Sequence, residues 1–331
     1  MLGRIRIAAS LQRWELLLGA LAIIGLSTGM LFVAWQLREV VANDPTCFVA
    51  EPPERCRDLM EQFGNLGGLG GQLLTYSAIG SMALSVILGV PIVSREIEHG
   101  TAPIAWALTT SRLRWLLWRV AIIGGCLVAV LAVGAVASTI LAASLLPDSN
   151  AGADFSWYGQ RGSLLIVRGL LGFAIGVLAG AFVGRQLPAL LLTLAVTAAT
   201  FLGANLVLDR WLMTDAIPAR FALPNQEISF NGSRSLGGFM QLTSGEIVTG
   251  DELAARGYAL TEGSWDYERD EFYATPQDRI AKRNLLGWHV DLLVPGSKYP
   301  VAVGKESVLL GGLFALGIGL AAVIVRQRRP Y

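Results

Sequence analysis

Charged residues are scarce in this sequence of 331 residues, which is 15% charged and 53% hydrophobic. Soluble domains carry about a quarter charged residues, so the composition excludes an ordinary soluble protein. Histidine and cysteine are scarcer still, at two and three residues. Zinc fingers, iron–sulfur clusters and thioredoxin-type motifs need more ligands or a closer cysteine pair. The net charge of +1 gives no basic field for nucleic acid.

Two further absences narrow the function. No Gly-x4-Gly-Lys-Ser/Thr phosphate loop occurs, because Gly304-Lys305 is followed by Glu306 and lacks a suitably spaced glycine before it. The apolar runs hold no acid or base except Arg168 at the margin of one run, whereas a proton-coupled carrier needs such a group in the bilayer. His99 and His289 lie outside these runs, away from any serine nucleophile within them. The sequence therefore argues against a nucleotide site on this chain, proton coupling and intramembrane serine hydrolysis.

Long uncharged runs are what the sequence does contain. A bilayer core of about 30 Å needs roughly 20 apolar helical residues. We expect transmembrane helices over 16–37, 73–93, 115–145, 169–184, 186–208 and 307–325. The fourth run is short, so we expect its helix to extend outward through 163–167 and Arg168 to snorkel to the interface rather than face the bundle interior.

The distribution of charge predicts the orientation. With both termini in the cytoplasm, the segments 1–15, 94–119, 185 and 326–331 hold 11 of the 26 basic residues and three of the 25 acidic ones. Basic residues are enriched in cytoplasmic segments. The first apolar run is longer than that of a cleaved signal peptide, so we expect it to be retained. The predicted fold class is an all-α polytopic membrane protein with six transmembrane helices and cytoplasmic N- and C-termini.

The segment 209–304 is expected to be an extracellular α+β insert between the fifth and sixth helices. It lacks a long apolar run, and 246–249 and 290–294 are rich in strand-forming residues. Capping patterns predict helices over 249–256 and 275–287. The predicted domains are therefore 1–208, which includes a cytoplasmic loop over 94–114, then 209–304, and finally 305–331 with the sixth helix and a basic tail.

Cys47 and Cys56 both fall in the first external loop, where Pro45, Pro52 and Pro53 stiffen the connection. Thiols on the external side of the membrane are in an oxidising environment. A disulfide would close a small loop and stabilise it by about 2–3 kcal/mol on the loop-entropy model. The alternative is a pair of free thiols.

Small and hydroxylated residues recur at helical spacing within three of the runs. A glycine at every fourth position lets a neighbouring helix approach closely, which predicts a packing face at Gly172, Gly176, Gly180 and Gly184. Hydroxyl stripes can either bond back to their own helix carbonyls or line a path for an amphiphilic cargo. The residues concerned are Ser77, Ser81 and Ser85 in one run and Thr193, Thr197, Thr200 and Asn205 in another.

The predicted cytoplasmic loop contains a short helical pattern. Gly100 supplies a turn, Thr101 an N-cap and Pro103 an early helical position, and the helix that follows carries Trp106. Ser111 then caps the third transmembrane helix. The loop is either a lever for a cytoplasmic partner or a stiff connector.

This loop resembles that of permease subunits of ABC-2 type transporters, also called type V exporters. Their pattern is Glu-x-Glu-x-Gly-Thr, an apolar stretch, and Pro-x-Ser-Arg. The matching residues are Glu96, Glu98, Gly100, Thr101, Ser111 and Arg112, whereas Thr109 stands in the place of proline and Trp118-Arg119 in that of a frequent Gly-Lys. The stretch 295–299 with Glu306 is also similar to one in some actinobacterial permeases of this type.

The resemblance implies a transport subunit rather than an enzyme, in the inner membrane of a bacterium. It further implies two copies of a separate ATPase that binds ATP and Mg²⁺, a second permease chain that is identical or related, and a coupling role for the loop, including Trp106. The cargo is then an amphiphilic or hydrophobic drug, lipid or peptide that is exported. No cofactor is expected on this chain.

The alternative is a membrane-embedded enzyme or receptor that uses the external insert to act on or bind lipid or cell-envelope ligands. An enzyme would need convergent acids in that insert. The dense acidic run there consists of Asp266, Glu268, Asp270 and Glu271, and a solvated charge run explains it more simply.

Overall fold

The computed structural model describes residues 13–48, 53–107, 111–147, 150–221, 232–241, 246–248, 264–266, 271–273 and 288–328. The chain divides into two compact units. The first comprises Met1–Ala151, Trp157–Val207 and Val301–Tyr331, and the second comprises Gly152–Ser156 and Leu208–Pro300.

Six helices in the described residues are long and apolar enough to cross a membrane. They are α2 (Arg13–Asn43), α3 (Arg57–Gly89), which continues into α4 (Pro91–Glu98), α6 (Arg112–Leu145), α7 (Ser163–Val183), α8 (Gln186–Leu212) and α11 (Tyr299–Gln327). Short helices connect them: η1 (Pro45–Cys47), η2 (Glu54–Cys56), α5 (Ala102–Ala107), η3 (Ala151–Ala153), η4 (Met213–Asp215) and η5 (Gly296–Lys298). The expectation of six apolar helices is confirmed.

The second long helix begins earlier than predicted. We expected it to start near residue 73, but α3 starts at Arg57. The glycines over 64–71 lower the intrinsic helix propensity, and packing overrides that preference. A Cβ placed on Gly71 would collide with the ring of Trp157, and one on Gly70 would lie 3.3 Å from Leu145. Glycine at position 71 is therefore required for close packing rather than for a turn.

Helix α7 is the central element of the bundle. Its Phe173 is fully buried in a cluster that includes residues of α3, α6 and α11. Its Leu171 and Ile175 pack against Leu310 of α11, together with residues of α8. The shortest of the six long helices is thus surrounded by protein, and its neighbours form the outer surface of the bundle.

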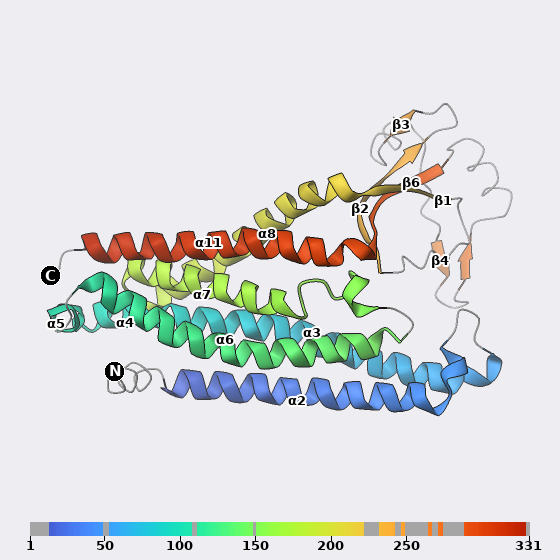
Figure 1. The fold of residues 1–331 in the computed structure, drawn as a ribbon, viewed down its shortest axis with the longest axis horizontal. Helices are drawn as coiled ribbons and strands as arrows, with labels where there is room; N and C mark the ends of the chain where they lie inside the picture. Colours follow the sequence, from blue (N-terminus) through green and yellow to red (C-terminus); the bar gives the residue numbers. More distant parts are fainter. Residues whose placement is uncertain are drawn as a thin grey trace. The chain divides into compact units, whose positions relative to one another are not determined.

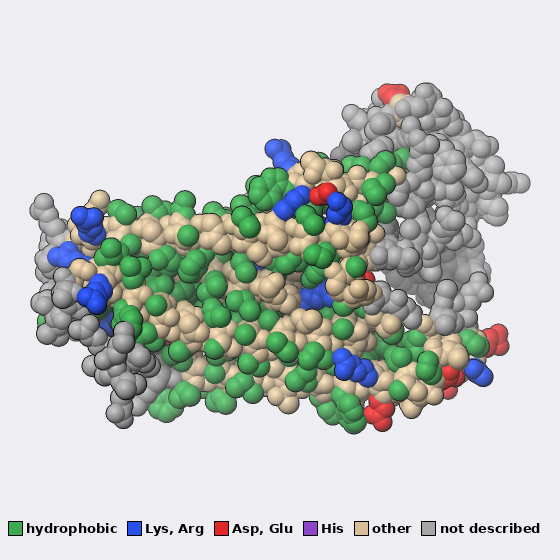
Figure 2. Space-filling model, viewed as in Figure 1, with side chains coloured by type: hydrophobic (Ala, Val, Ile, Leu, Met, Phe, Trp, Pro, Cys, Tyr) green, Lys and Arg blue, Asp and Glu red, His purple; other side chains and the backbone are tan. Residues whose placement is uncertain are grey.

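One end of the bundle gathers α4, α5, the start of α2 and the end of α11 (Figure 1). Hydrophobic side chains cover the length of the bundle in the view of Figure 2, and Lys and Arg side chains gather at this end. We call it the α5 end. It contains the segments that the sequence analysis assigned to the cytoplasm.

The second unit contains two small antiparallel sheets in its described residues. The strands are β1 (Ile217–Phe221), β2 (Arg234–Gln241), β3 (Ile247–Val248), β4 (Ser264–Asp266), β5 (Glu271–Tyr273) and β6 (Trp288–Val294). One sheet has the order β1-β6-β2-β3, and β4 pairs with β5 in the other. The strands expected over 246–249 and 290–294 correspond to β3 and β6. The helices expected over 249–256 and 275–287 fall outside the described residues.

Candidate functional site

The site is built on the α5 end, where the chain turns from α4 through α5 into α6. Gly100 has φ +68°, a left-handed conformation that glycine adopts without strain, and it ends α4. The Ser111 hydroxyl accepts a hydrogen bond from the backbone N–H of Arg114 at 3.1 Å and caps α6. The structure confirms the predicted turn at Gly100 and the predicted cap at Ser111. Thr109 lies outside the described residues.

Glu96 of α4 has its partners within the chain. One carboxylate oxygen accepts from Arg119 Nη2 of α6 at 2.7 Å, and the other accepts from the hydroxyl of Thr101 at 2.6 Å. Both charged side chains of the pair are largely buried. The carboxylate therefore joins the end of α4 to both the start of α5 and the body of α6.

Two neighbouring charges extend these ties to other helices. Glu98 Oε2 accepts from the backbone N–H of Gln186 at 3.0 Å, so a carboxylate satisfies one of the free N–H groups at the start of α8. Arg95 Nη1 lies 3.6 Å from Glu15 Oε1 of α2. The three charged residues of α4 thus connect it to α2, α6 and α8.

Trp106 of α5 is buried against its own chain. Its exposed fraction is 7%, its ring meets that of Trp115 edge to face at 6.4 Å, and the guanidinium of Arg112 lies over it at 4.8 Å. Ile104, by contrast, is 64% exposed. The ring of Trp106 therefore fixes α5 onto α6, and Ile104 is the apolar surface that α5 presents outward.

Arg112 also connects the α4–α5 segment (residues 91–107) to the last helix. Its Nη1 donates to the backbone carbonyl of Arg328, and Arg328 Nη1 donates in turn to the carbonyl of Ala181 in the last turn of α7. Gly184 ends α7 with φ +73° and lies against this guanidinium. Sequence reasoning missed this chain of contacts, because it joins residues far apart in the sequence and the only available signal was the excess of basic residues in the inner segments.

The predicted glycine face is a packing surface within the chain. An added Cβ would lie 3.7 Å from Ser85 at Gly172, and 3.1 Å from the backbone N of Val90 at Gly176. At Gly180 it would collide with the carbonyl oxygen of Val90. This face therefore holds α7 against α3 and α4, as glycine-spaced helices do in membranes.

Most residues of the two hydroxyl stripes are buried or bond back to their own helix. Ser77, Ser81 and Ser85 are all 2% exposed or less, and the Ser85 hydroxyl donates to the Ser81 carbonyl at 2.7 Å. The serine stripe lies inside the bundle, so its packing does not support the interpretation as a cargo path.

The second stripe behaves in a similar way. The hydroxyls of Thr193 and Thr200 donate to carbonyls one turn earlier, at 2.6 and 2.7 Å. Thr197 is buried, whereas Asn205 is exposed. The back-bonding alternative applies to Thr193 and Thr200.

Arg168 does not snorkel, which corrects our expectation. Its Nε donates to Glu306 Oε1 of α11 at 2.8 Å, Nη1 donates to the Gly159 carbonyl at 3.2 Å, and the guanidinium lies 5.7 Å from the ring centroid of Phe201 in α8. The Glu306 side chain is almost completely buried. Hydropathy gives no signal for this pair, because Glu306 lies one residue before the apolar run 307–325.

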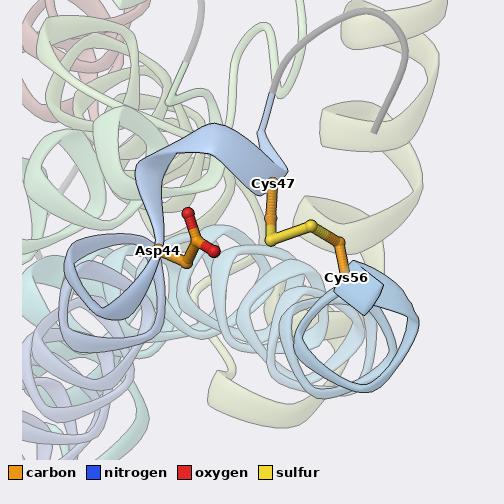
Figure 3. Close-up of side chains that lie close together, drawn as sticks. All are labelled: Asp44, Cys47 and Cys56. Carbon is orange, nitrogen blue, oxygen red and sulfur yellow. A yellow bond between two sulfur atoms is a disulfide. The ribbon is translucent and has the colours of Figure 1, made fainter. Parts of the chain in front are cut away.

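Cys47 and Cys56 form a disulfide with their Cα atoms 5.3 Å apart (Figure 3). It joins η1 to η2, and thereby the end of α2 to the start of α3. Asp44 lies beside it, and a hydrogen bond from the Thr46 side chain lowers the pKa of the Asp44 carboxyl, with Arg55 acting in the same direction. Asp44 and the two sulfurs are close enough to suggest a metal site, but bonded sulfurs do not offer the thiolate that a metal requires.

The structure describes only part of the acidic run of the second unit. Asp266 and Glu271 are directly opposite each other in the β4–β5 pair. Glu268 and Asp270 lie outside the part of the chain that the structure describes. Among the described residues of this acidic run, the backbone therefore brings only Asp266 and Glu271 opposite each other.

Six apolar helices, of which the glycine-faced α7 is the central one, define a polytopic membrane protein. The chain belongs to the ABC-2 membrane transporter related family, whose model matches residues 19–208. The match spans nearly all of α2 to α8 and includes α4 and α5. Permeases of this family are transport subunits that work with an ATPase in a membrane. Comparison with curated proteins and with solved structures finds no match.

Proposed function

We propose that this chain is the permease subunit of an ATP-driven exporter in the inner membrane of a bacterium, and that α4 and α5 couple it to a separate ATPase subunit. The observation that carries the proposal is the set of polar ties from the α5 end. They run from α4 to α2, α6 and α8, and from the start of α6 to the end of α11. A displacement of this segment would therefore act on most of the bundle at once.

A coupling role also follows from the energetics of transport. A permease without a nucleotide site moves only as far as its contacts with the ATPase differ between nucleotide states, because a partner with equal affinity for both conformations shifts neither. Ile104 offers an exposed apolar side chain on a short helix that Trp106 holds in place. An apolar anchor on a rigid support is what the centre of a protein interface requires.

The composition of the complete transporter is part of the proposal. Two ATPase subunits that bind ATP and Mg²⁺ would join two permeases, which are two copies of this chain or this chain with a relative. The cargo is an amphiphilic or hydrophobic drug, lipid or peptide. The buried serine stripe argues against a polar path between α3 and α7, so the cargo would move along another face of the bundle.

Site-directed crosslinking tests the docking role. Ile104→Cys in a Cys126→Ala background should crosslink to an ATPase subunit that copurifies with the chain, with a yield that changes at least threefold between nucleotide-free and ATP-bound complexes. Val308→Cys is the matched control, because Val308 is also strongly exposed but lies in the half of α11 away from the α5 end. Absence of a copurifying ATPase, or equal yields at the two positions, would contradict the proposal.

A further inference from the structure

Helix α11 is held to α7 by polar contacts near both of its ends. Away from the α5 end, Arg168 Nε donates to Glu306 Oε1 at 2.8 Å. At the α5 end, Arg328 Nη1 donates to the carbonyl of Ala181. Both contacts are specific and directional, so they fix the position of α11 against α7 more tightly than apolar packing alone.

Between these contacts the two helices approach closely at small residues. A Cβ placed on the buried Gly317 would lie 3.4 Å from the Cβ of Ala174 and 3.7 Å from its carbonyl oxygen. A methyl group fits in that space, and a longer side chain would push the helices apart. Small residues at a crossing allow one helix to tilt against another without large side chains interlocking.

The crossing divides the polar contacts of α11 evenly. Gly317 is eleven residues from Glu306 and eleven from Arg328, which is about 16 Å on each side at 1.5 Å per residue. A tilt of α11 about Gly317 therefore moves Glu306 as far as it moves Arg328, in the opposite direction.

Each end of α11 contacts a charged side chain of another helix. At the α5 end, Arg112 donates to the Arg328 carbonyl, and Arg112 is the first residue of α6, which follows the α4–α5 segment. At the other end, the Glu306 side chain is 4% exposed, and its Oε2 has no hydrogen-bond partner among the described residues. A buried carboxylate with one oxygen left unbonded is incompletely satisfied, and the ion pair with Arg168 is the contact that a tilt of α11 would have to break, at the cost of separating two largely buried charges.

We propose that α11 is a lever that pivots at Gly317 and Ala174. Displacement of Arg112 moves Arg328, and the opposite arm separates Glu306 from Arg168, which opens the contact between α7 and α11 in the half of the bundle away from the α5 end. The inference rests on the proposed function, because the displacement of Arg112 comes from the ATPase that binds at α5.

A pair of cysteines across the helix contact tests the lever in the complex with the ATPase. Leu171→Cys and Leu310→Cys replace two residues of one buried cluster, in a Cys126→Ala background. A bifunctional thiol reagent should crosslink the two cysteines without nucleotide and at least fivefold more slowly when ATP is trapped on the ATPase. Arg112→Ala should abolish that difference, whereas Arg326→Ala, which removes an exposed charge from the same end of α11, should retain it.

The pivot has its own matched pair of variants. Gly317→Ala should preserve the ATP-dependent change and Gly317→Leu should remove it, and equal behaviour of the two variants overturns the pivot. An unchanged crosslinking rate with ATP, while Ile104→Cys still reports nucleotide, overturns the lever and leaves the proposed function intact. Loss of nucleotide dependence at both positions overturns both.

A second measurement needs only the permease. Arg112 contacts Arg328, which is about 33 Å from Glu306 along α11, a separation at which the effects of two substitutions normally add. If the lever transmits force, the shifts in unfolding midpoint caused by Arg112→Ala and Glu306→Gln should not add in the double variant. Additive shifts overturn the lever, whatever the outcome with the ATPase.

Discussion

At Glu96 a single carboxylate joins three segments of the chain. Arg119 and Thr101 together satisfy both of its oxygens, and the pair with Arg119 is largely shielded from water. Exposed ion pairs contribute little to stability, whereas a shielded pair that loses one member leaves the other charge without a partner. Glu96 therefore stabilises the conformation of the α4–α5 segment. A partner that binds this segment would depend on Glu96 through that conformation.

A double-mutant cycle on the Glu96–Arg119 pair measures this contribution. Glu96→Ala and Arg119→Ala should each lower the free energy of unfolding by about 1.5–3 kcal/mol, as expected for hydrogen bonds to charged groups. The double variant should show a coupling energy of about 1–3 kcal/mol. Arg114→Ala on the same helix is the control, since its side chain is exposed. Strict additivity would show that the two charges act independently.

The cysteines allow a prediction that needs no substitution. Cys47 and Cys56 are bonded and Cys126 is free. Intact-mass analysis of the unfolded protein should therefore show one alkylation without a reductant and three after reduction. Three alkylations without reduction would show that Cys47 and Cys56 are not bonded.

Among the elements, α7 depends most strongly on the absence of side chains. Gly176 and Gly180 lie against the backbone around Val90, and backbone atoms do not move aside as a flexible side chain can. The helix also ends where Gly184 adopts a left-handed conformation. Its position at the centre of the bundle therefore depends on glycines, because a side chain at Gly176 or Gly180 would collide with the backbone around Val90.

Substitution of this glycine face should destabilise the bundle. Gly176→Leu and Gly180→Leu should each cost about 1–3 kcal/mol or more, which is the usual penalty for overpacking. Gly203→Leu on α8 is the matched control, because an added Cβ there would meet nothing within 4 Å. Thermal unfolding of the purified protein in detergent is the measurement. If Gly203→Leu lowers the unfolding temperature as much as the two variants do, the destabilisation comes from leucine in any of these helices and not from the glycine face.

The sequence predicted the elements better than their contacts. Hydropathy located six spans, and the Gly100 turn and the Ser111 cap followed from local chemistry that acts within four residues. The start of α3 was wrong because glycine propensity is a local quantity and the packing of Gly71 against Trp157 is not. The Arg168–Glu306 pair joins residues 138 positions apart, and no spacing rule connects them. The internal partners of Glu96 and Glu98 were missed for the same reason.

At the scale of the whole molecule, the chain combines an apolar bundle with a strand-containing unit inserted between α8 and α11. Strands β1, β2, β3 and β6 of that unit form one sheet, and an open sheet edge is not tolerated in hydrocarbon. We therefore predict that the second unit lies outside the hydrocarbon core of the membrane. The excess of basic residues in the segments of the α5 end predicts that this end is cytoplasmic and that the second unit is extracellular.

Labelling of intact cells tests this topology. Ser297→Cys in the second unit and Ser111→Cys at the α5 end replace two exposed serines, in a Cys126→Ala background. A membrane-impermeant maleimide should label position 297 in whole cells and position 111 only after lysis. The reverse pattern would invert the orientation and would place α5 out of reach of a cytoplasmic ATPase.

The Arg168–Glu306 pair also has a consequence for how the protein is made. A ribosome delivers α7 to the membrane long before α11, with most of the second unit synthesised in between. During that interval Arg168 has no counter-ion in α11, and an unpaired arginine raises the cost of inserting a helix, by about 2.5–3.5 kcal/mol at the helix centre and by less in the first two turns, where Arg168 lies. Until Glu306 arrives, α7 must be retained by its neighbours α3 and α6 or by the insertion machinery. Nascent chains that end before residue 306 should therefore be the ones that release α7 from the bilayer and are degraded.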